Sequence, residues 1–320
     1  AQATLAQEPR WLLSPRPEAS VPPPRGGGRA ADMADFPVPL QSLPRTTYRC
    51  RRECEGPQAC LHIAESQSGE TGWRVWRASR FLCRFLERAA AGPTPPFREG
   101  SAVLELGAGC GLVGIVCAHL GARVTITDLD IVLPLTSYNV QQNALPPECR
   151  GHAQVKQLRW GSDVRSAFPP GSFDLIVGSD LTWAIQWDGP LLLATLLQLV
   201  SEHTLIVVSL TLRPTQIQGW HDLFDHYFTI TVLATDSDPE LLQDPGDESA
   251  CSAGTQSTAC QSDDEYTLKY FDDSGDEGRA MNVLQLKPVL PLPPEDVIRE
   301  LIRNTSSAKP AASRPVNDSD

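Results

Sequence analysis

The chain has 320 residues, 41% of them hydrophobic, which is enough to bury a real core in one large domain or two small ones. Its net charge of −12 argues against duplex nucleic acid as the main partner, because binding to phosphates needs a basic face. No stretch approaches about 18 consecutive apolar residues, so we expect no membrane span. The nine cysteines are an odd number, which favours reduced thiols in a cytosolic or nuclear protein.

The negative charge is concentrated in one segment. Between Asp236 and Glu277 there are 13 acidic residues and one basic residue, Lys269, and the two signs balance in the rest of the chain. The composition of residues 236–264 predicts a disordered acidic insert. Such a segment is compatible with a basic protein partner.

Residues 1–45 contain proline and glycine runs without a sustained apolar period, so we expect a disordered tail. Cys50, Cys54, Cys60 and His62 follow at a spacing that could supply four zinc ligands. The paired C-x2-C knuckles of stronger zinc motifs are absent. We therefore expect incidental cysteines and no bound metal.

The next informative stretch runs from residue 71 to residue 86. Apolar side chains at positions 75, 78, 81, 82, 85 and 86 predict an amphipathic helix with arginines on its other face. Prolines at 93, 95 and 96 end this helix. Taken alone, Trp76 would be interpreted as a core tryptophan at the start of a helix.

A glycine-rich turn follows. Residues 103–106 are a short apolar run, Gly107, Gly109 and Gly111 come next, and residues 112–120 have apolar side chains at helical spacing. This order predicts a strand, a glycine-rich turn and a helix. Glycine allows positive φ, and its missing Cβ lets a ligand approach the backbone. The next apolar run ends at Asp128, where an acidic residue suits the two hydroxyls of a ribose.

The spacing of the glycines distinguishes two kinds of cofactor. A dinucleotide site needs a small residue where this chain has Leu112, so a nicotinamide dehydrogenase is disfavoured. The run from Glu105 to Gly111 instead resembles motif I of the seven-strand S-adenosylmethionine-dependent methyltransferases. The resemblance implies that Glu105 and the glycines contact S-adenosylmethionine and that Asp128 holds its ribose. It also implies an α/β, Rossmann-like sheet of seven strands with helices on both faces and an antiparallel last strand.

Three further stretches resemble the methyltransferase-like family 16 group of protein-lysine methyltransferases. They are Gly72-x-x-Val-Trp76 before a helix, Asn139-Val-x-x-Asn143 after the acidic residue, and a strand followed by Trp160 and a glycine. The resemblance implies that Trp76 lies close to the cofactor, that Trp160 flanks its adenine, and that an N-terminal β-hairpin is present. Asn139 and Asn143 are interpreted either as surface or capping amides or as structural groups beside the site.

Five more strands are expected at 155–158, 173–180, 204–211, 228–233 and 281–286. The second of these brings Ser179 and Asp180 to the carboxyl edge of the sheet, where ligands of open α/β sheets bind. The resembled group has Asp-x-x-Tyr at this edge, whereas this chain has Asp180-Leu-Thr-Trp183. The resemblance implies that Asp180 and Trp183 face the lysine substrate. Tryptophan keeps an aromatic wall and loses the tyrosine hydroxyl.

We therefore expect a methyltransferase domain at 46–287, interrupted by the insert, and a flexible tail at 288–320 with a short helix near 295–302. The expected function is methyl transfer from S-adenosylmethionine to a lysine of a protein, by a monomer in the cytoplasm or nucleus. One alternative is methylation of histidine or a small amine. Another is a non-catalytic adaptor that binds a cofactor or a partner through the former methyltransferase site.

Overall fold

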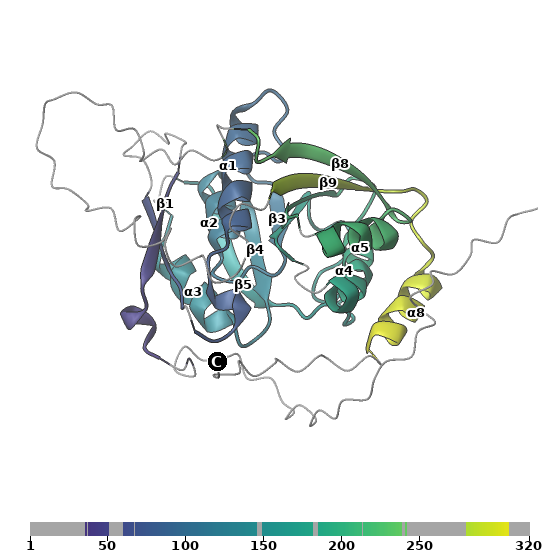
Figure 1. Ribbon diagram of the computed structural model, residues 1–320, viewed down its shortest axis with the longest axis horizontal. Coiled ribbons are helices and arrows are strands. Elements are labelled where there is room, and N and C mark those ends of the chain that lie inside the picture. Colours follow the sequence, from purple (N-terminus) through teal and green to yellow (C-terminus); the bar gives the residue numbers. More distant parts are fainter. Residues whose placement is uncertain are drawn as a thin grey trace, which may run out of the picture.

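The computed structural model describes residues 36, 38–50, 60–66, 68–145, 149–181, 185–212, 214–238, 241 and 280–306 (Figure 1). Its main sheet has seven strands in the order β5-β4-β3-β6-β7-β9-β8. The strands are β3 (Ala102–Glu105), β4 (Arg123–Asp128), β5 (His152–Gln157), β6 (Leu175–Ser179), β7 (Leu205–Thr211), β8 (Phe228–Thr235) and β9 (Met281–Pro288).

The strand directions confirm the expected sheet. Strands β5, β4, β3, β6 and β7 are parallel to their neighbours, and β9 lies antiparallel between β7 and β8. Since β3 lies between β4 and β6, the chain reverses its direction of travel across the sheet at β3. The carboxyl ends of these central strands therefore meet at the edge where open α/β sheets bind ligands.

Helices cover both faces of the sheet (Figure 1). They are α1 (Arg77–Ala91), α2 (Leu112–His119), α3 (Leu133–Gln142), α4 (Ile185–Leu199), α5 (Pro214–Phe224) and α8 (Glu295–Ser306). Side chains alternate along each strand, so Val103 of β3 packs in the cluster of α1, α2 and α3, while Leu104 packs with α4 and α5. Cys83, Cys110 and Cys117 are buried free thiols in the first cluster.

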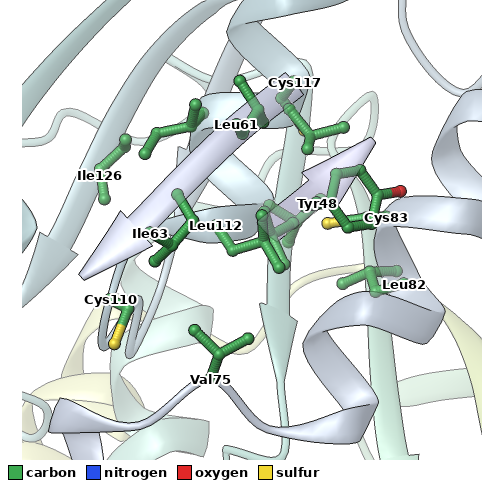
Figure 2. Packing of buried hydrophobic residues seen from close by; sticks show 14 of the residues in the cluster. Tyr48, Leu61, Ile63, Val75, Leu82, Cys83, Cys110, Leu112, Cys117 and Ile126 are labelled. Carbon is green, nitrogen blue, oxygen red and sulfur yellow. The ribbon is translucent and has the colours of Figure 1, made fainter. Parts of the chain in front are cut away.

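The expected hairpin is present at the N-terminal side of the domain. It consists of β1 (Arg45–Arg49) and β2 (Cys60–Ala64), which pair antiparallel. Figure 2 shows that its side chains Tyr48 and Ile63 belong to the same buried cluster as Leu82 of α1 and Leu112 of α2. The packed chain begins earlier than the expected boundary at residue 46, because Phe36, Leu40 and Leu43 are also buried in this cluster, although they form no periodic pattern in the sequence.

A buried polar network attaches the hairpin to α1. The hydroxyl of Tyr48 donates to Glu87 Oε2 at 2.7 Å, and Arg84 Nη1 donates to the carbonyl oxygen of Arg49 at 2.7 Å. The Arg84 guanidinium also lies 4.4 Å from the centre of the Tyr48 ring. Arg84 was expected on the solvent-facing side of α1, but it is 4% exposed, because β1 covers that side of the helix.

Two asparagines attach the hairpin to α3. Asn139 accepts from the backbone N–H of Ala64 at 2.8 Å and donates to its carbonyl at 2.9 Å. Asn143, one turn later, makes the same pair of bonds to His62 at 2.8 and 3.0 Å. The two amides thus bind the outer backbone edge of β2 as a neighbouring strand would, and of their two interpretations the structure favours the structural role.

The residues whose spacing could supply zinc ligands differ in their burial where the structure describes them. Cys50 is buried, Cys60 and His62 are exposed, and Cys54 lies outside the described residues. Within the described ranges, no three His, Cys, Asp or Glu residues form a group that could hold a metal ion. The helices in these ranges are all too short or too polar to cross a membrane.

The C-terminal segment differs from the expected flexible tail. Helix α8 runs over residues 295–306 and packs against α4, with Ile298 buried at 4% exposure. Its apolar residues Ile298, Leu301 and Ile302 join the cluster on the α4 side of the sheet. The expected acidic insert lies mainly outside the described residues.

We predict that Asn139→Ala destabilises the fold by roughly 3 kcal/mol, because it leaves the backbone groups of Ala64 and the carbonyl of Cys110 without a buried partner. Gln142→Ala on the exposed face of α3 is the control and should change stability by less than about 0.5 kcal/mol. Urea denaturation followed by circular dichroism measures both. Equal midpoints for the two variants would show that the hairpin does not depend on this amide.

Candidate functional site

The glycine-rich turn joins β3 to α2. Gly107, Gly109 and Gly111 all have left-handed backbones, with φ of 57°, 55° and 83°. The turn is closed by hydrogen bonds from the N–H of Gly111 to the carbonyl of Ala108 at 2.8 Å and from the N–H of Ala108 to Thr127 at 3.0 Å. Left-handed φ strains any residue with a Cβ, so the sequence of this turn is dictated by its backbone.

Close contacts also favour glycine at all three positions, and a Cβ on Gly111 would lie 3.0 Å from the Thr136 side chain. A Cβ on Gly109 would lie 2.8 Å from the carbonyl oxygen of Gly72, and a Cβ on Gly107 would lie 3.0 Å from Leu181 and 3.1 Å from the Trp160 ring. Gly72 belongs to η4 (Thr71–Trp73), a short 3-10 helix. The turn is therefore bordered by η4 at Gly109 and by Trp160 and Leu181 at Gly107.

Asp128 faces the turn from the end of β4. Its Oδ2 accepts from the N–H of Gly109 at 2.7 Å, and its Oδ1 accepts from the N–H of Leu129 at 2.7 Å. Burial raises the pKa of the Asp128 carboxyl, and the two N–H groups act in the opposite direction. A carboxylate has about four lone-pair positions, so two remain for donors such as a pair of ribose hydroxyls.

Glu105 lies behind the turn rather than on its open side. It is 1% exposed, and its Oε2 accepts from the N–H of Gly114 in the first turn of α2 at 2.9 Å. Burial raises the pKa of Glu105 to about 8, and the nearby charge of Asp128 contributes in the same direction. Glu105 was expected among the residues that contact the cofactor, whereas this geometry suits a residue that fixes the start of α2 beneath the turn.

The two expected tryptophans have different surroundings. Trp76 precedes α1, and its indole N–H donates to the carbonyl of Thr71 at 3.0 Å, which folds the ring back on η4. Trp160 follows β5, is half-buried against the α4 cluster and reaches Gly107. The structure therefore brings Trp160 to the border of the turn and Trp76 to η4, which contacts the turn at Gly109, although 84 positions of sequence separate the two tryptophans.

Asp180 begins the loop after β6, beside Ser179. Ser179 is paired with Ser209 of β7, so it lies at the carboxyl edge as expected. Asp180 has φ of 49°, unusual for a residue with a side chain, and its carboxylate accepts from the N–H of Thr211 at 2.9 Å and from its hydroxyl at 2.8 Å. These bonds fix the orientation of the carboxylate. Trp183 lies outside the described residues.

Sequence reasoning missed Thr136 and Leu181, which shape the turn, and left a structural role beside the site as one of two interpretations of Asn139. The hydroxyl of Thr136 in α3 donates to the carbonyl of Gly109 at 2.7 Å, and the amide of Asn139 donates to Cys110 at 2.9 Å. Leu181 occupies an unspecified position of the Asp-x-x-Tyr pattern, so that pattern assigns it no role. The helical spacing of Val132, Thr136 and Asn139 was a usable signal, because it places all three on one face of α3.

The raised pKa of Glu105 leads to a stability prediction. Its pKa is about 4.3 in an unfolded chain and about 8 in the fold, so the folded state holds the extra proton. This contribution to stability is complete below about pH 4 and is lost as pH rises to about 8, at up to about 1.4 kcal/mol per pH unit. Glu105→Gln cannot titrate, so between about pH 5 and pH 8 the unmodified protein should lose more stability than this variant. Parallel pH profiles from guanidinium melts of the two proteins would contradict the assignment.

Comparison with known proteins agrees with this geometry. Residues 55–226 match the lysine methyltransferase family. The chain is 37% identical to the protein N-lysine methyltransferase METTL21A of Mus musculus over 167 residues, which cover 52% of this chain and 73% of the relative. It is 41% identical to the METTL21A of Danio rerio, again over 52% of this chain and 73% of the relative. It is also 41% identical to the EEF1A lysine methyltransferase 3 of Mus musculus, over 44% of this chain and 56% of the relative. Because the family match takes in more than half of the sequence, the chain belongs to the lysine methyltransferase family.

Proposed function

We propose that this chain transfers a methyl group from S-adenosylmethionine to the side-chain amine of a lysine in a protein. One observation supports this function above the others. The Asp128 carboxylate is hydrogen-bonded to the N–H of Gly109, in a turn built on three glycines with left-handed backbones. A carboxylate with acceptor positions suited to sugar hydroxyls and a glycine turn are thereby held together at the carboxyl edge of the sheet.

The residues around the turn fit the chemical parts of this cofactor. Asp128 has acceptor positions for the two ribose hydroxyls. Trp160 offers an indole face of the kind on which purines stack, a contact worth roughly 1–3 kcal/mol. The turn itself, bordered by η4 at Gly109, suits the methionine part. The family to which the chain belongs consists of methyltransferases, which supports the same choice.

When bound, S-adenosylmethionine supplies an electrophilic methyl group on a positively charged sulfur. The chain has to bring the lysine nitrogen into line with that methyl group and exclude water, which accounts for most of the rate in such displacements. We assign to Asp180 the role of positioning the lysine amine for this alignment. Its carboxylate is held by two bonds to Thr211, and a fixed negative charge at this edge favours an approaching ammonium group.

The lysine must lose its proton before it reacts, and we assign no general base among the described residues. Trp183 follows three positions after Asp180 and is proposed as an aromatic wall that contacts the ammonium through a cation–π interaction. The named relatives act on lysines of proteins, which supports a protein as the substrate here. The acidic segment at 236–277 favours a basic partner, and we propose a monomer that acts in the cytoplasm or nucleus.

Calorimetry with S-adenosylhomocysteine tests the cofactor assignment. We predict measurable binding, and we predict that Asp128→Ala weakens it by about 10- to 100-fold, the usual effect of losing hydrogen bonds to a charged group. Asp130→Ala is the matched control, because Asp130 is an exposed acidic residue two positions away whose one ion pair, to Arg159, is also exposed. If the unmodified protein does not bind S-adenosylhomocysteine, the proposed function is wrong.

Transfer of a labelled methyl group into proteins of a cell lysate tests catalysis. We predict that Asp180→Asn lowers the transfer rate by at least about tenfold and leaves S-adenosylhomocysteine affinity within about twofold, because Asp180 is assigned to the acceptor. Asp225→Asn, on the surface after α5, serves as the control. Undiminished label with Asp180→Asn would show that the acceptor side is misplaced.

A further inference from the structure

The loop after β5 is held by one face of α4. The N–H of Gly161 donates to Thr195 Oγ1 at 2.9 Å, and the N–H of Val164 donates to Gln198 Oε1 at 3.0 Å. The Gln198 amide donates in turn to the carbonyl of Ser162 at 2.9 Å. Thr195 and Gln198 are three positions apart, so a single face of the helix binds three backbone groups of the loop that begins at Trp160.

These two polar side chains are unusual for their surroundings. Both are fully buried, in a helix whose neighbouring positions are Leu196, Leu197 and Leu199. Their remaining hydrogen-bonding groups are used inside the helix, where Thr195 donates to Leu191 at 2.8 Å and Gln198 to Ala194 at 3.0 Å. An apolar residue would pack here without any need for a partner, so the packing of the helix alone does not call for polar side chains.

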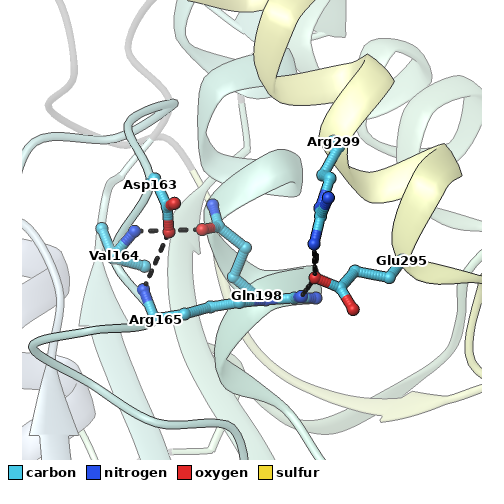
Figure 3. A network of polar contacts seen from close by, with 6 residues as sticks. All are labelled: Asp163, Val164, Arg165, Gln198, Glu295 and Arg299. Atoms are coloured by element: carbon cyan, nitrogen blue, oxygen red, sulfur yellow. Dashed lines mark hydrogen bonds and ion pairs between the residues drawn. The ribbon is translucent and has the colours of Figure 1, made fainter.

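Helix α8 supports the same loop from outside. Figure 3 shows Asp163, Val164 and Arg165 of the loop beside Gln198, with Glu295 and Arg299 of α8 facing Arg165. Arg165 lies 3.1 Å from Glu295, and Glu295 also pairs with Arg299. These ion pairs are partly or largely exposed and contribute little individually, so the buried bonds from α4 fix the loop.

The bonds from α4 to the loop determine where Trp160 lies. The loop turns sharply at Gly161, where φ is 75°, and places the Trp160 ring against Gly107 of the glycine turn. A backbone bound at Gly161, Ser162 and Val164 has little freedom to move the indole toward or away from that turn. Thr195 and Gln198, which lie beneath the loop, therefore fix the position of the Trp160 ring relative to the glycine turn.

We propose that Thr195 and Gln198 are positioning residues that hold the Trp160 ring at the border of the glycine turn, in the orientation that lets its exposed part stack on an adenine ring. This inference rests on the proposed function, because it assumes that an adenine-containing cofactor binds there. It assigns to Thr195 and Gln198 of α4 a part in cofactor affinity that acts through Trp160.

The experiment compares two threonine-to-valine changes by calorimetry with S-adenosylhomocysteine. Thr195→Val removes the acceptor of Gly161 and keeps the side-chain shape, and we expect it to weaken binding by about fivefold. Thr204→Val is the matched control: Thr204 is also buried and accepts from the N–H of Ser201 at 3.0 Å, but it precedes β7 at the opposite edge of the sheet. Thr195→Ser keeps the hydroxyl and should retain the original affinity.

A double-mutant cycle with Trp160→Ala separates positioning from general destabilisation. If Thr195 acts through Trp160, Thr195→Val should change affinity by less than about twofold in the Trp160→Ala background. An equal loss in both backgrounds, or a loss of the same size with Thr204→Val, would overturn the inference. Gln198→Met replaces Thr195→Val in this cycle if the valine variant does not fold.

The outcomes also distinguish this inference from the proposed function. If the unmodified protein binds S-adenosylhomocysteine and folded Thr195→Val binds it equally well, only the positioning role is wrong. If the unmodified protein does not bind it at all, the proposed function fails and the inference fails with it.

Discussion

The hydrogen bond from the N–H of Gly109 to the carboxylate of Asp128 is the contact on which the site depends. It joins the end of β4 to the turn that follows β3, so two neighbouring strands fix one backbone group. The bond forms because the turn is left-handed at its three glycines, which aims an N–H at the next strand. With a side chain at Gly109, the approach of Gly72 would be blocked, and η4 could not close over the turn.

The rest of the domain supports this turn from two sides. On one face, the hairpin is attached to α1 through Arg84 and Glu87 and to α3 through Asn139, and the connection that follows it places η4 on the turn. On the other face, Thr195 and Gln198 bind the loop that presses Trp160 against Gly107. Both supports are made of buried polar groups, most of which bond to backbone, and such bonds fix position more strictly than apolar packing does.

The two acidic residues beside the glycine turn, Glu105 and Asp128, have different environments and therefore different roles. Glu105 is buried under the turn and has a pKa of about 8, raised mainly by burial, so it is largely protonated at neutral pH. Asp128 accepts two backbone N–H groups, which favour its charged form against the effect of burial. A neutral Glu105 leaves one negative charge beside the turn, at the position suited to sugar hydroxyls. With Glu105 neutral and Asp128 charged, the two carboxyl groups do not repel each other. In a family of methyltransferases, this arrangement supports binding of a nucleoside.

The sequence alone determined the seven strands, their order of appearance and the glycine turn with its acidic partner, because apolar periodicity and backbone requirements are local properties. It did not reveal that Arg84 is buried, that Asn139 binds the hairpin, or that α8 packs on α4. Each of these depends on a partner far along the chain, such as Tyr48 for Arg84 and Ala64 for Asn139. Tertiary structure also decided that Glu105 lies beneath the turn and Asp128 beside it, because burial and hydrogen-bond geometry are set only when the strands and helices meet.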